Sequence, residues 1–359
     1  MSRYTVLVTG ANGFLGQHIV RLLQEKADFV THLKVLDIRK FSNQLNYKER
    51  KPVEAFVGNI TDVAVLESAT RDVDCVIHIA SVVDVRLFPD KTNLHNINVI
   101  GAELLLQVCI RQNVRHFVYC SSQSVVIGYK DITDSDETSE IPKDFLFGQY
   151  SVTKHLAEQI VKSQDGAYLP DGGKLRTLSL RPVTMYGELD VHWAPNILRW
   201  ASILGGTICQ FANGTSQAAY AGNVAWGFVC AVKALRENSD LGGEVFFVCD
   251  DTPLGNMFQL VDPFLKSCGL KMTNFILPYW FMVFLAVVLI CIAWIISPIY
   301  QINSNFTPRS VRYINMKVNS VYKKASEILD YKPLYSHEES VRRSIEYYKQ
   351  PNTRFGSAR

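Results

Sequence analysis

The chain has 359 residues, a formal net charge of +3 at pH 7 and 48% hydrophobic residues. This length and composition support a substantial core and favour one large α/β unit with a second lobe. Basic residues do not cluster with an aromatic binding module, so a nucleic-acid partner is not expected. The eight cysteines are scattered without a CxxC pair, so we expect reduced thiols and no metal site.

Seven apolar runs have the length and composition of buried strands, and helical stretches separate them. This alternation predicts an α/β fold with a Rossmann-type, doubly wound parallel sheet. The predicted strands cover residues 4–9, 33–37, 53–57, 73–79, 115–121, 175–181 and 244–249. Residues 1–183, completed by about 218–250, are the expected dinucleotide-binding domain, and residues 184–217 and 251–274 are expected in a smaller substrate lobe.

A glycine-rich turn follows the first predicted strand, and a helix is predicted from Phe14 to Lys26. The glycines have a GxxGxxG spacing. Gly10 permits the tight turn, Gly13 lets the backbone approach a pyrophosphate at the helix N-terminus, and Gly16 lets the helix pack close to the strand. The turn therefore predicts a dinucleotide site, with an ordinary strand–helix turn as the alternative.

The second predicted strand ends in Asp37, about 20 residues after the turn. A carboxylate at this place accepts hydrogen bonds from ribose hydroxyls and repels a 2′-phosphate. The sequence therefore favours NAD over NADP, although the positive charges of Arg39 and Lys40 follow directly and weaken this preference. A solvated carboxylate at a strand end is the alternative.

Tyr150 and Lys154 are four residues apart in a helix predicted from Gly148 to Val161, so they share one helix face. A phenol has a pKa of about 10. A nearby ammonium ion and a positive nicotinamide ring favour the phenolate. Ser122 follows the strand predicted at 115–121 and can hold the substrate oxygen beside the phenol. This set predicts hydride transfer with Tyr150 as the acid–base group, whereas an isolated YxxxK also fits a plain surface helix.

With these motifs the chain resembles the extended short-chain dehydrogenases/reductases, and within them the 3β-hydroxysteroid dehydrogenase/Δ5–Δ4 isomerase family. The resemblance runs over nearly the whole chain. The more specific matches are Val35-Leu36-Asp37, Asn96-Ile97-Asn98-Val99, Gly222-Asn223-Val224-Ala225-Trp226, Asp250-Asp251-Thr252-Pro253 and Tyr331-Lys332-Pro333-Leu334-Tyr335-Ser336. The resemblance implies NAD-dependent oxidation of a steroid or sterol 3β-hydroxyl to the 3-ketone.

The resemblance also implies which residues contact NAD. In addition to the three glycines, Asp37 and Lys154, these are Phe14, Leu15, Asn59, Ile60, Ala80 and Pro182. The family usually has Asp where this chain has Asn59, so that contact loses its charge. Asn98 either supports a water chain to Lys154 or is a structural Asn.

The family's second activity moves a double bond, and an acidic pair in its DDTP segment has been implicated. Asp250 and Asp251 occupy these positions. The alternative is a turn after the strand, with Asp251 or Thr252 capping the next helix. The resemblance therefore leaves isomerisation open.

Two further interpretations of the chain remain. One is a 4-carboxysterol 3-dehydrogenase, in which oxidation promotes decarboxylation, because residues 121–126 are somewhat like that group. The other, of a different class, is a non-catalytic NAD-binding membrane scaffold. The intact Ser122, Tyr150 and Lys154 count against a scaffold.

Residues 272–308 contain no charged residue, and the apolar segment 275–300 is long enough to cross a bilayer core of about 30 Å. Residues 301–359 are expected to close the substrate lobe and end in a basic tail. The segment should therefore return to the same side, as a re-entrant hairpin or an interfacial helix, with Pro278 and Pro298 at its ends. A very apolar buried helix is the alternative.

The expected partners are a steroid or sterol and membrane lipid, and a homodimer is left open. The expected location is a membrane of the endoplasmic reticulum or the mitochondria, with the catalytic domain facing the cytosol. The strand-like sequence that starts at residue 4 leaves no room for a secretory leader, in agreement with this expectation.

Overall fold

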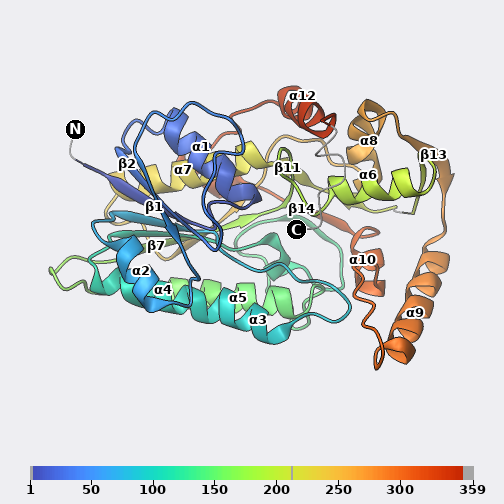
Figure 1. Cartoon of the computed structure of the whole chain (residues 1–359), viewed down its shortest axis with the longest axis horizontal. Coiled ribbons are helices and arrows are strands. Elements are labelled where there is room, and N and C mark those ends of the chain that lie inside the picture. The colour runs from blue at the N-terminus through green and yellow to red at the C-terminus, as the bar shows by residue number, and fades with distance from the viewer. Residues whose placement is uncertain (1–2, 212, 351–359) are drawn as a thin grey trace.

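A computed structural model describes residues 3–211 and 213–350, and a seven-stranded parallel sheet lies at its centre (Figure 1). The strand order is β3-β2-β1-β4-β5-β7-β12. The strands are β1 (Thr5–Thr9), β2 (His32–Asp37), β3 (Val53–Val57), β4 (Cys75–His78), β5 (His116–Cys120), β7 (Arg176–Pro182) and β12 (Glu244–Val248). Each lies on a predicted run, which confirms the doubly wound α/β fold. The order reverses between β1 and β4, and such a switch point opens a ligand crevice at the carboxyl ends of the strands.

Helices cover both faces of this sheet (Figure 1). On one face pack α1 (Phe14–Lys26), α7 (Ala221–Glu237) and α11 (Lys323–Leu329). On the other face are α2 (Val63–Thr70), α3 (Lys91–His95), α4 (Gly101–Arg111) and α5 (Gln149–Ser163). A separate apolar core fills the space between the sheet and each layer of helices. The sheet is therefore held rigidly, and its carboxyl edge can position side chains precisely.

The smaller lobe is built from short sheets and three helices. Its strands pair as β10 (Thr215–Ser216), β14 (Lys317–Ser320) and β6 (Ile132–Ser135), as β11 (Ala218–Tyr220) with β8 (Thr184–Tyr186), and as β13 (Lys271–Ile276) with β9 (Thr207–Gln210). Its helices are α6 (Ala194–Ile203), α8 (Met257–Ser267) and α12 (His337–Tyr348). Strand β6 comes from the first half of the chain, so the smaller lobe contains residues from before as well as from after residue 183. Part of the expected basic tail, residues 351–359, lies outside the described residues.

The start of α8 differs from the expectation. Asn256 caps this helix, because its side chain accepts from the amide of Phe258 at 2.8 Å and Gln259 completes a capping box. Neither Asp251 nor Thr252 is the cap, since they lie too far before the first helical residue, Met257. The capping role predicted for them is therefore wrong.

The uncharged stretch contains the helix α9 (Tyr279–Ile296), which lies at the edge of the smaller lobe beside α10 (Pro308–Tyr313) (Figure 1). Pro278 precedes its first residue and Pro298 follows its C-cap, as predicted. Within the described residues α9 is the one helix long and apolar enough to cross a membrane, and only 17% of it is buried. The alternative of a buried core helix is therefore wrong.

Candidate active site

A cavity of about 770 Å³ opens at the carboxyl edge of the large sheet, at the switch point. It brings together the predicted catalytic and cofactor-binding residues, which come from different strands and helices. Those that line it are Gly10, Gly13, Phe14, Leu15, Gly16, Asp37, Asn59, Ile60, Ala80, Ser122, Tyr150, Lys154 and Pro182. One continuous cavity thus joins the glycine turn to the Tyr–Lys pair.

The glycine turn has no room for a side chain at Gly10 or at Gly16. Gly10 has a φ of +70°, and a Cβ there would lie 2.8 Å from the backbone nitrogen and Cα of Ala80. A Cβ on Gly16 would lie 2.2 Å from the carbonyl oxygen of Gly10. Helix α1 starts immediately after Gly13, so its first amides face the turn. This cradle fits a dinucleotide pyrophosphate, which needs close backbone approach at a helix N-terminus.

The Asp37 carboxylate is fixed at the end of β2. One oxygen accepts from the amide of Asn12 at 2.9 Å and the other from the amide of Arg39 at 3.1 Å. A carboxylate has about four lone-pair sites, so both oxygens can still accept from ribose hydroxyls. The exposed side chain of Arg39 lines the same end of the cavity, whereas Lys40 contributes its carbonyl to Asn12. The geometry suits the proposed ribose contact.

Helix α5 presents Tyr150 and Lys154 to the cavity from one face. The Lys154 ammonium donates to the carbonyl of Cys120 at 2.8 Å and lies 5.2 Å from the centre of the Tyr119 ring. Burial lowers the pKa of Lys154, and the nearby Glu158 carboxylate opposes this effect. The ammonium is thus held at the end of β5, where it can serve both the phenol and a ribose.

Tyr150 departs from one expectation. Burial raises the pKa of its phenol above the ordinary value, and a hydrogen bond with Ser122 offsets part of the rise. We predicted that the Lys154 ammonium lowers the pKa of Tyr150. In the protein without cofactor, this effect does not outweigh the rise in pKa that burial causes. Ser122 also accepts from the amide of Ser124 at 3.1 Å, which fixes its hydroxyl at the start of a short 3₁₀ turn (Gln123–Val126).

A buried ion pair below the site was not predicted. Glu158 lies one helical turn beyond Lys154 and is fully buried. It accepts from the Arg181 guanidinium at 2.6 and 2.9 Å and from the Ser121 hydroxyl at 2.6 Å. The pair ties α5 to β7 and to the residue next to Ser122. The same four-residue spacing that links Tyr150 to Lys154 would have placed Glu158 on this face.

Asn98 has a structural position. It lies in a π-helical turn (Asn96–Ile100) before α4, a kind of bulge that often occurs near functional sites. Its carboxamide pairs with both backbone groups of Val82, at 2.7 and 3.0 Å, and donates to the Thr153 hydroxyl at 3.1 Å. The side chain is therefore engaged in holding the segment after β4 beside α5.

Asp250 and Asp251 lie outside the cavity lining. The buried Asp250 carboxylate accepts from the amides of Tyr220 and Thr252 and from the Asn223 side chain, at 2.8 to 3.0 Å. Asp251 accepts from the Tyr322 hydroxyl at 2.7 Å on the exposed side. These contacts favour the interpretation as a structural turn.

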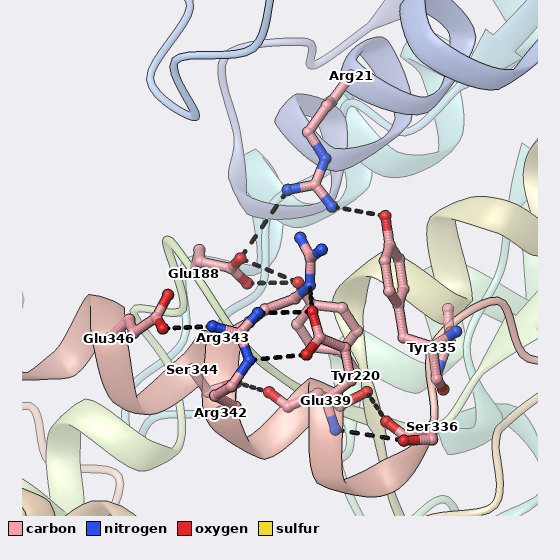
Figure 2. Close-up of polar contacts among 12 residues, drawn as sticks. Arg21, Glu188, Tyr220, Tyr335, Ser336, Glu339, Arg342, Arg343, Ser344 and Glu346 are labelled. Atoms are coloured by element: carbon pink, nitrogen blue, oxygen red, sulfur yellow. Dashed lines mark hydrogen bonds and ion pairs between the residues drawn. The ribbon is translucent and has the colours of Figure 1, made fainter.

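The loop of residues 187–193 forms a further wall, through Asp190, His192 and Trp193. Figure 2 shows the polar cluster that anchors its start. The Tyr220 hydroxyl contacts both oxygens of Glu188, at 2.8 and 2.9 Å, and the buried Arg21 of α1 donates to the Tyr335 hydroxyl at 3.1 Å.

The same cluster reaches the C-terminal helix. The Arg343 guanidinium of α12 stacks 4.5 Å from the Tyr335 ring and donates to Glu339 at 2.6 Å (Figure 2). Tyr348, at the end of α12, donates to the carbonyl of Gly187 at 3.0 Å. The C-terminal segment therefore packs against both α1 and the loop that borders the cavity.

The chain is similar to an epimerase from Methanothermobacter thermautotrophicus, with a TM-score of 0.72, 19% identity and coverage of 96% of this chain and 92% of the other. It is also similar to DesIV, a dTDP-glucose 4,6-dehydratase from Streptomyces venezuelae with NAD bound, with a TM-score of 0.70, 18% identity and coverage of 97% and 98%. These likenesses confirm the fold.

The sequence comparison is more specific. Mouse 3 beta-hydroxysteroid dehydrogenase type 7 is 31% identical over 366 aligned residues, which cover 98% of this chain and 97% of the mouse protein. The sequence profile of the 3-beta hydroxysteroid dehydrogenase/isomerase family matches residues 7–279. The chain therefore belongs to the 3-beta hydroxysteroid dehydrogenase/isomerase family.

Proposed function

We propose that this protein oxidises the 3β-hydroxyl of a neutral, membrane-borne sterol or steroid to the ketone, with NAD as its cofactor. The observation that carries the proposal is the single cavity that joins the glycine cradle and Asp37 to Ser122, Tyr150 and Lys154. When bound, NAD supplies the hydride acceptor that an alcohol dehydrogenase requires.

The chain's own residues supply binding and proton transfer. Gly10, Gly13 and Asp37 hold the dinucleotide at the carboxyl edge of the sheet. Ser122 donates to the alcohol oxygen, and Tyr150 takes the proton of the alcohol, a role that contributes about 10²- to 10⁴-fold to such rates. The Lys154 ammonium stabilises the Tyr150 phenolate, the form of the side chain that can accept this proton, and Glu158 helps to keep that lysine protonated.

The character of the remaining wall supports a neutral lipid. Beyond the catalytic residues the lining is rich in apolar side chains, including Val82, Val83, Val85, Ile127, Phe147, Met185, Trp193, Met257 and Tyr313. In the described part of the lining, the only Lys or Arg residues are Arg39, at the end that holds Asp37, and Lys154. A diphosphate or carboxylate on the substrate would be held most strongly by an Arg or Lys side chain on this wall. The lining therefore favours a neutral sterol over a nucleotide sugar or a 4-carboxysterol.

A substrate panel tests this assignment. Detergent-solubilised protein is incubated with NAD and either 3β-hydroxysterols, 4-carboxysterols or nucleotide sugars, and the products are identified by mass spectrometry. We expect ketones that have lost two hydrogens from the neutral sterols. Products that have also lost CO2 would instead support the decarboxylating dehydrogenase, and cofactor binding without turnover of any substrate would support the non-catalytic scaffold.

Isomerisation is a separate matter, because it needs a group that moves a proton between ring carbons. Asp250 and Asp251 are engaged in structural contacts outside the cavity, so we propose that the acidic pair stabilises the turn after β12. Asp251→Asn should then leave the ratio of conjugated to unconjugated ketone unchanged. A selective loss of the conjugated product would return Asp251 to the catalytic set.

We also propose that α9 holds the protein on one face of a membrane, with the chain before and after it on the same side. Before α9, β13 pairs with β9, and after it β14 pairs with β6. The cluster in Figure 2 joins the C-terminal segment to α1. These contacts cannot form across a bilayer, whereas an interfacial helix keeps them.

Protease treatment of sealed microsomes tests this topology, with a tag at the C-terminus. Loss of the tag together with the N-terminal domain is expected. A protected tag beside a digested N-terminal domain would show a crossing. The choice between endoplasmic reticulum and mitochondria, and the orientation towards the cytosol, stay predictions that fractionation of cells can check.

A further inference from the structure

Two walls of the cavity are attached to the same apolar structure. We call residues 279–306, which comprise α9 and the chain that follows it, the apolar hairpin, and residues 82–90, between β4 and α3, the flap. Val82, Val83 and Val85 of the flap line the cavity. Figure 1 shows α9 and α10 beside each other at the edge of the molecule, away from the helices that flank the large sheet.

The tip of the flap is bound to the apolar hairpin by backbone and side-chain contacts. The Asn303 carboxamide pairs with both backbone groups of Phe88, at 3.0 and 3.2 Å. The amide of Leu87 donates to the carbonyl of Ser304 at 2.9 Å. The Phe88 ring meets the Trp294 ring of α9 edge to face, with centroids 5.4 Å apart. We call the contacts of Asn303, Ser304 and Trp294 with the flap the latch.

The flap is a preformed unit. Its buried Asp84 carboxylate accepts two bonds from the Arg86 guanidinium, at 2.7 and 2.8 Å, and a third from the amide of Asp90 at 3.0 Å. Its first residue, Val82, is fixed by Asn98. The loop therefore keeps its shape by internal contacts, and the latch determines where its tip lies.

The opposite wall is attached to the apolar hairpin through α10. Val311 is buried against Met282 and Ala286 of α9. Two residues further along α10, Tyr313 lines the cavity, where its hydroxyl bonds to Thr184 at 3.0 Å and its ring meets Phe147 at 4.8 Å. Displacement of α9 would therefore act on both the flap and α10.

We propose that the sterol enters the cavity directly from the bilayer, between the flap and α10, and that the latch keeps this entrance aligned with the membrane. The inference rests on the proposed function and adds the route of the substrate. A sterol that passes through water exposes its apolar surface, whereas a path beside a membrane-bound helix avoids that exposure. The exposed Trp294, Ile295 and Ile299 place apolar surface next to the latch.

Asn303→Ala in the full-length protein tests the latch, with Asn305→Ala as the matched control. Asn305 is exposed in the same segment and forms no hydrogen bond to the rest of the described chain. Oxidation of one 3β-hydroxysterol is measured in phosphatidylcholine vesicles and in detergent micelles. Asn303→Ala removes two hydrogen bonds to the flap, so we expect about a tenfold lower rate in vesicles. The micelle rate should stay within about twofold of that of the unmodified protein, as should both rates of Asn305→Ala.

Equal losses in vesicles and micelles would show a structural role only and would overturn the proposal, as would an unchanged vesicle rate.

A second measurement does not depend on turnover. A diazirine-bearing 3β-hydroxysterol in vesicles is photolysed with the unmodified protein, and the labelled peptides are identified by mass spectrometry. Labels on the flap and on α10 are expected. Labels confined to residues 187–193, or no label, would overturn the route, whereas absent oxidation in micelles would overturn the proposed function instead.

Discussion

Gly16→Ala probes the cofactor cradle with an effect that can be worked out from the structure. The added Cβ would lie 2.2 Å from the Gly10 carbonyl oxygen and 2.8 Å from the Cα of Ala11. Carbon and oxygen atoms in contact are normally about 3.3 Å apart or more, so the turn must shift by about 1 Å. The opposing atoms belong to the backbone, so no flexible side chain can move aside.

Such overpacking costs about 1–3 kcal/mol. In the free variant the turn relieves the clash by moving out of the position that binds the pyrophosphate. To bind NAD, the turn must return to that position, so the energy of the clash is subtracted from the binding free energy. We therefore expect the Kd for NAD to rise by about 5- to 150-fold. Calorimetric titration with NAD measures this change, and thermal unfolding checks that the variant folds.

Gly255→Ala is the matched control. Its Cβ would lie 3.4 Å from Leu260, an ordinary contact, and Gly255 is not in the left-handed region. Its Kd for NAD should stay within about twofold of that of the unmodified protein, because most substitutions without a named clash change free energies by less than about 0.5 kcal/mol. A folded Gly16→Ala protein that binds NAD as tightly as the control would refute the assignment of the cradle.

Three further substitutions test the site. Tyr150→Phe should lower kcat by at least about 10²-fold with NAD binding retained, and a near-normal rate in a folded variant would remove the acid–base role. Asp37→Ala should weaken NAD binding and relatively improve NADP binding, whereas a strong NADP preference in the unmodified enzyme would contradict the ribose contact. Glu158→Gln removes a negative charge that raises the pKa of Lys154, so the fall of kcat at alkaline pH should move to lower pH. An unchanged pH profile of kcat would contradict this effect of Glu158 on Lys154. The same change leaves a buried guanidinium without its partner and should lower the free energy of unfolding by about 3–5 kcal/mol, measured in urea.

The sheet and the cofactor turn could be predicted because their determinants are local. Each of the seven strands is a short apolar run, and a run such as residues 5–9 is buried on both faces of the sheet. The glycines at 10 and 16 encode a close backbone approach that a larger residue would disrupt. The helix spacing of Tyr150 and Lys154 likewise places both side chains on one face.

The features that could not be predicted depend on residues far apart in sequence. Phe88 and Asn303 meet across 215 positions, and nothing in either segment alone specifies the other. The high pKa of Tyr150 follows from burial, which the motif does not reveal. The role of Asp250 depends on Tyr220 and Asn223 from another element, so the DDTP segment by itself left two interpretations open.

Hydride transfer from the 3-position of a sterol is the central claim, and a labelled substrate tests it most directly. A neutral 3β-hydroxysterol that carries deuterium on C3 is incubated with NAD and the unmodified protein, with Tyr150→Phe as the control. Mass spectrometry of the reduced cofactor should find the deuterium there, in an amount equal to the 3-ketone formed, and far less of both with the variant. Ketone formation without deuterium in the cofactor, or no oxidation of any neutral 3β-hydroxysterol, would contradict the proposed function.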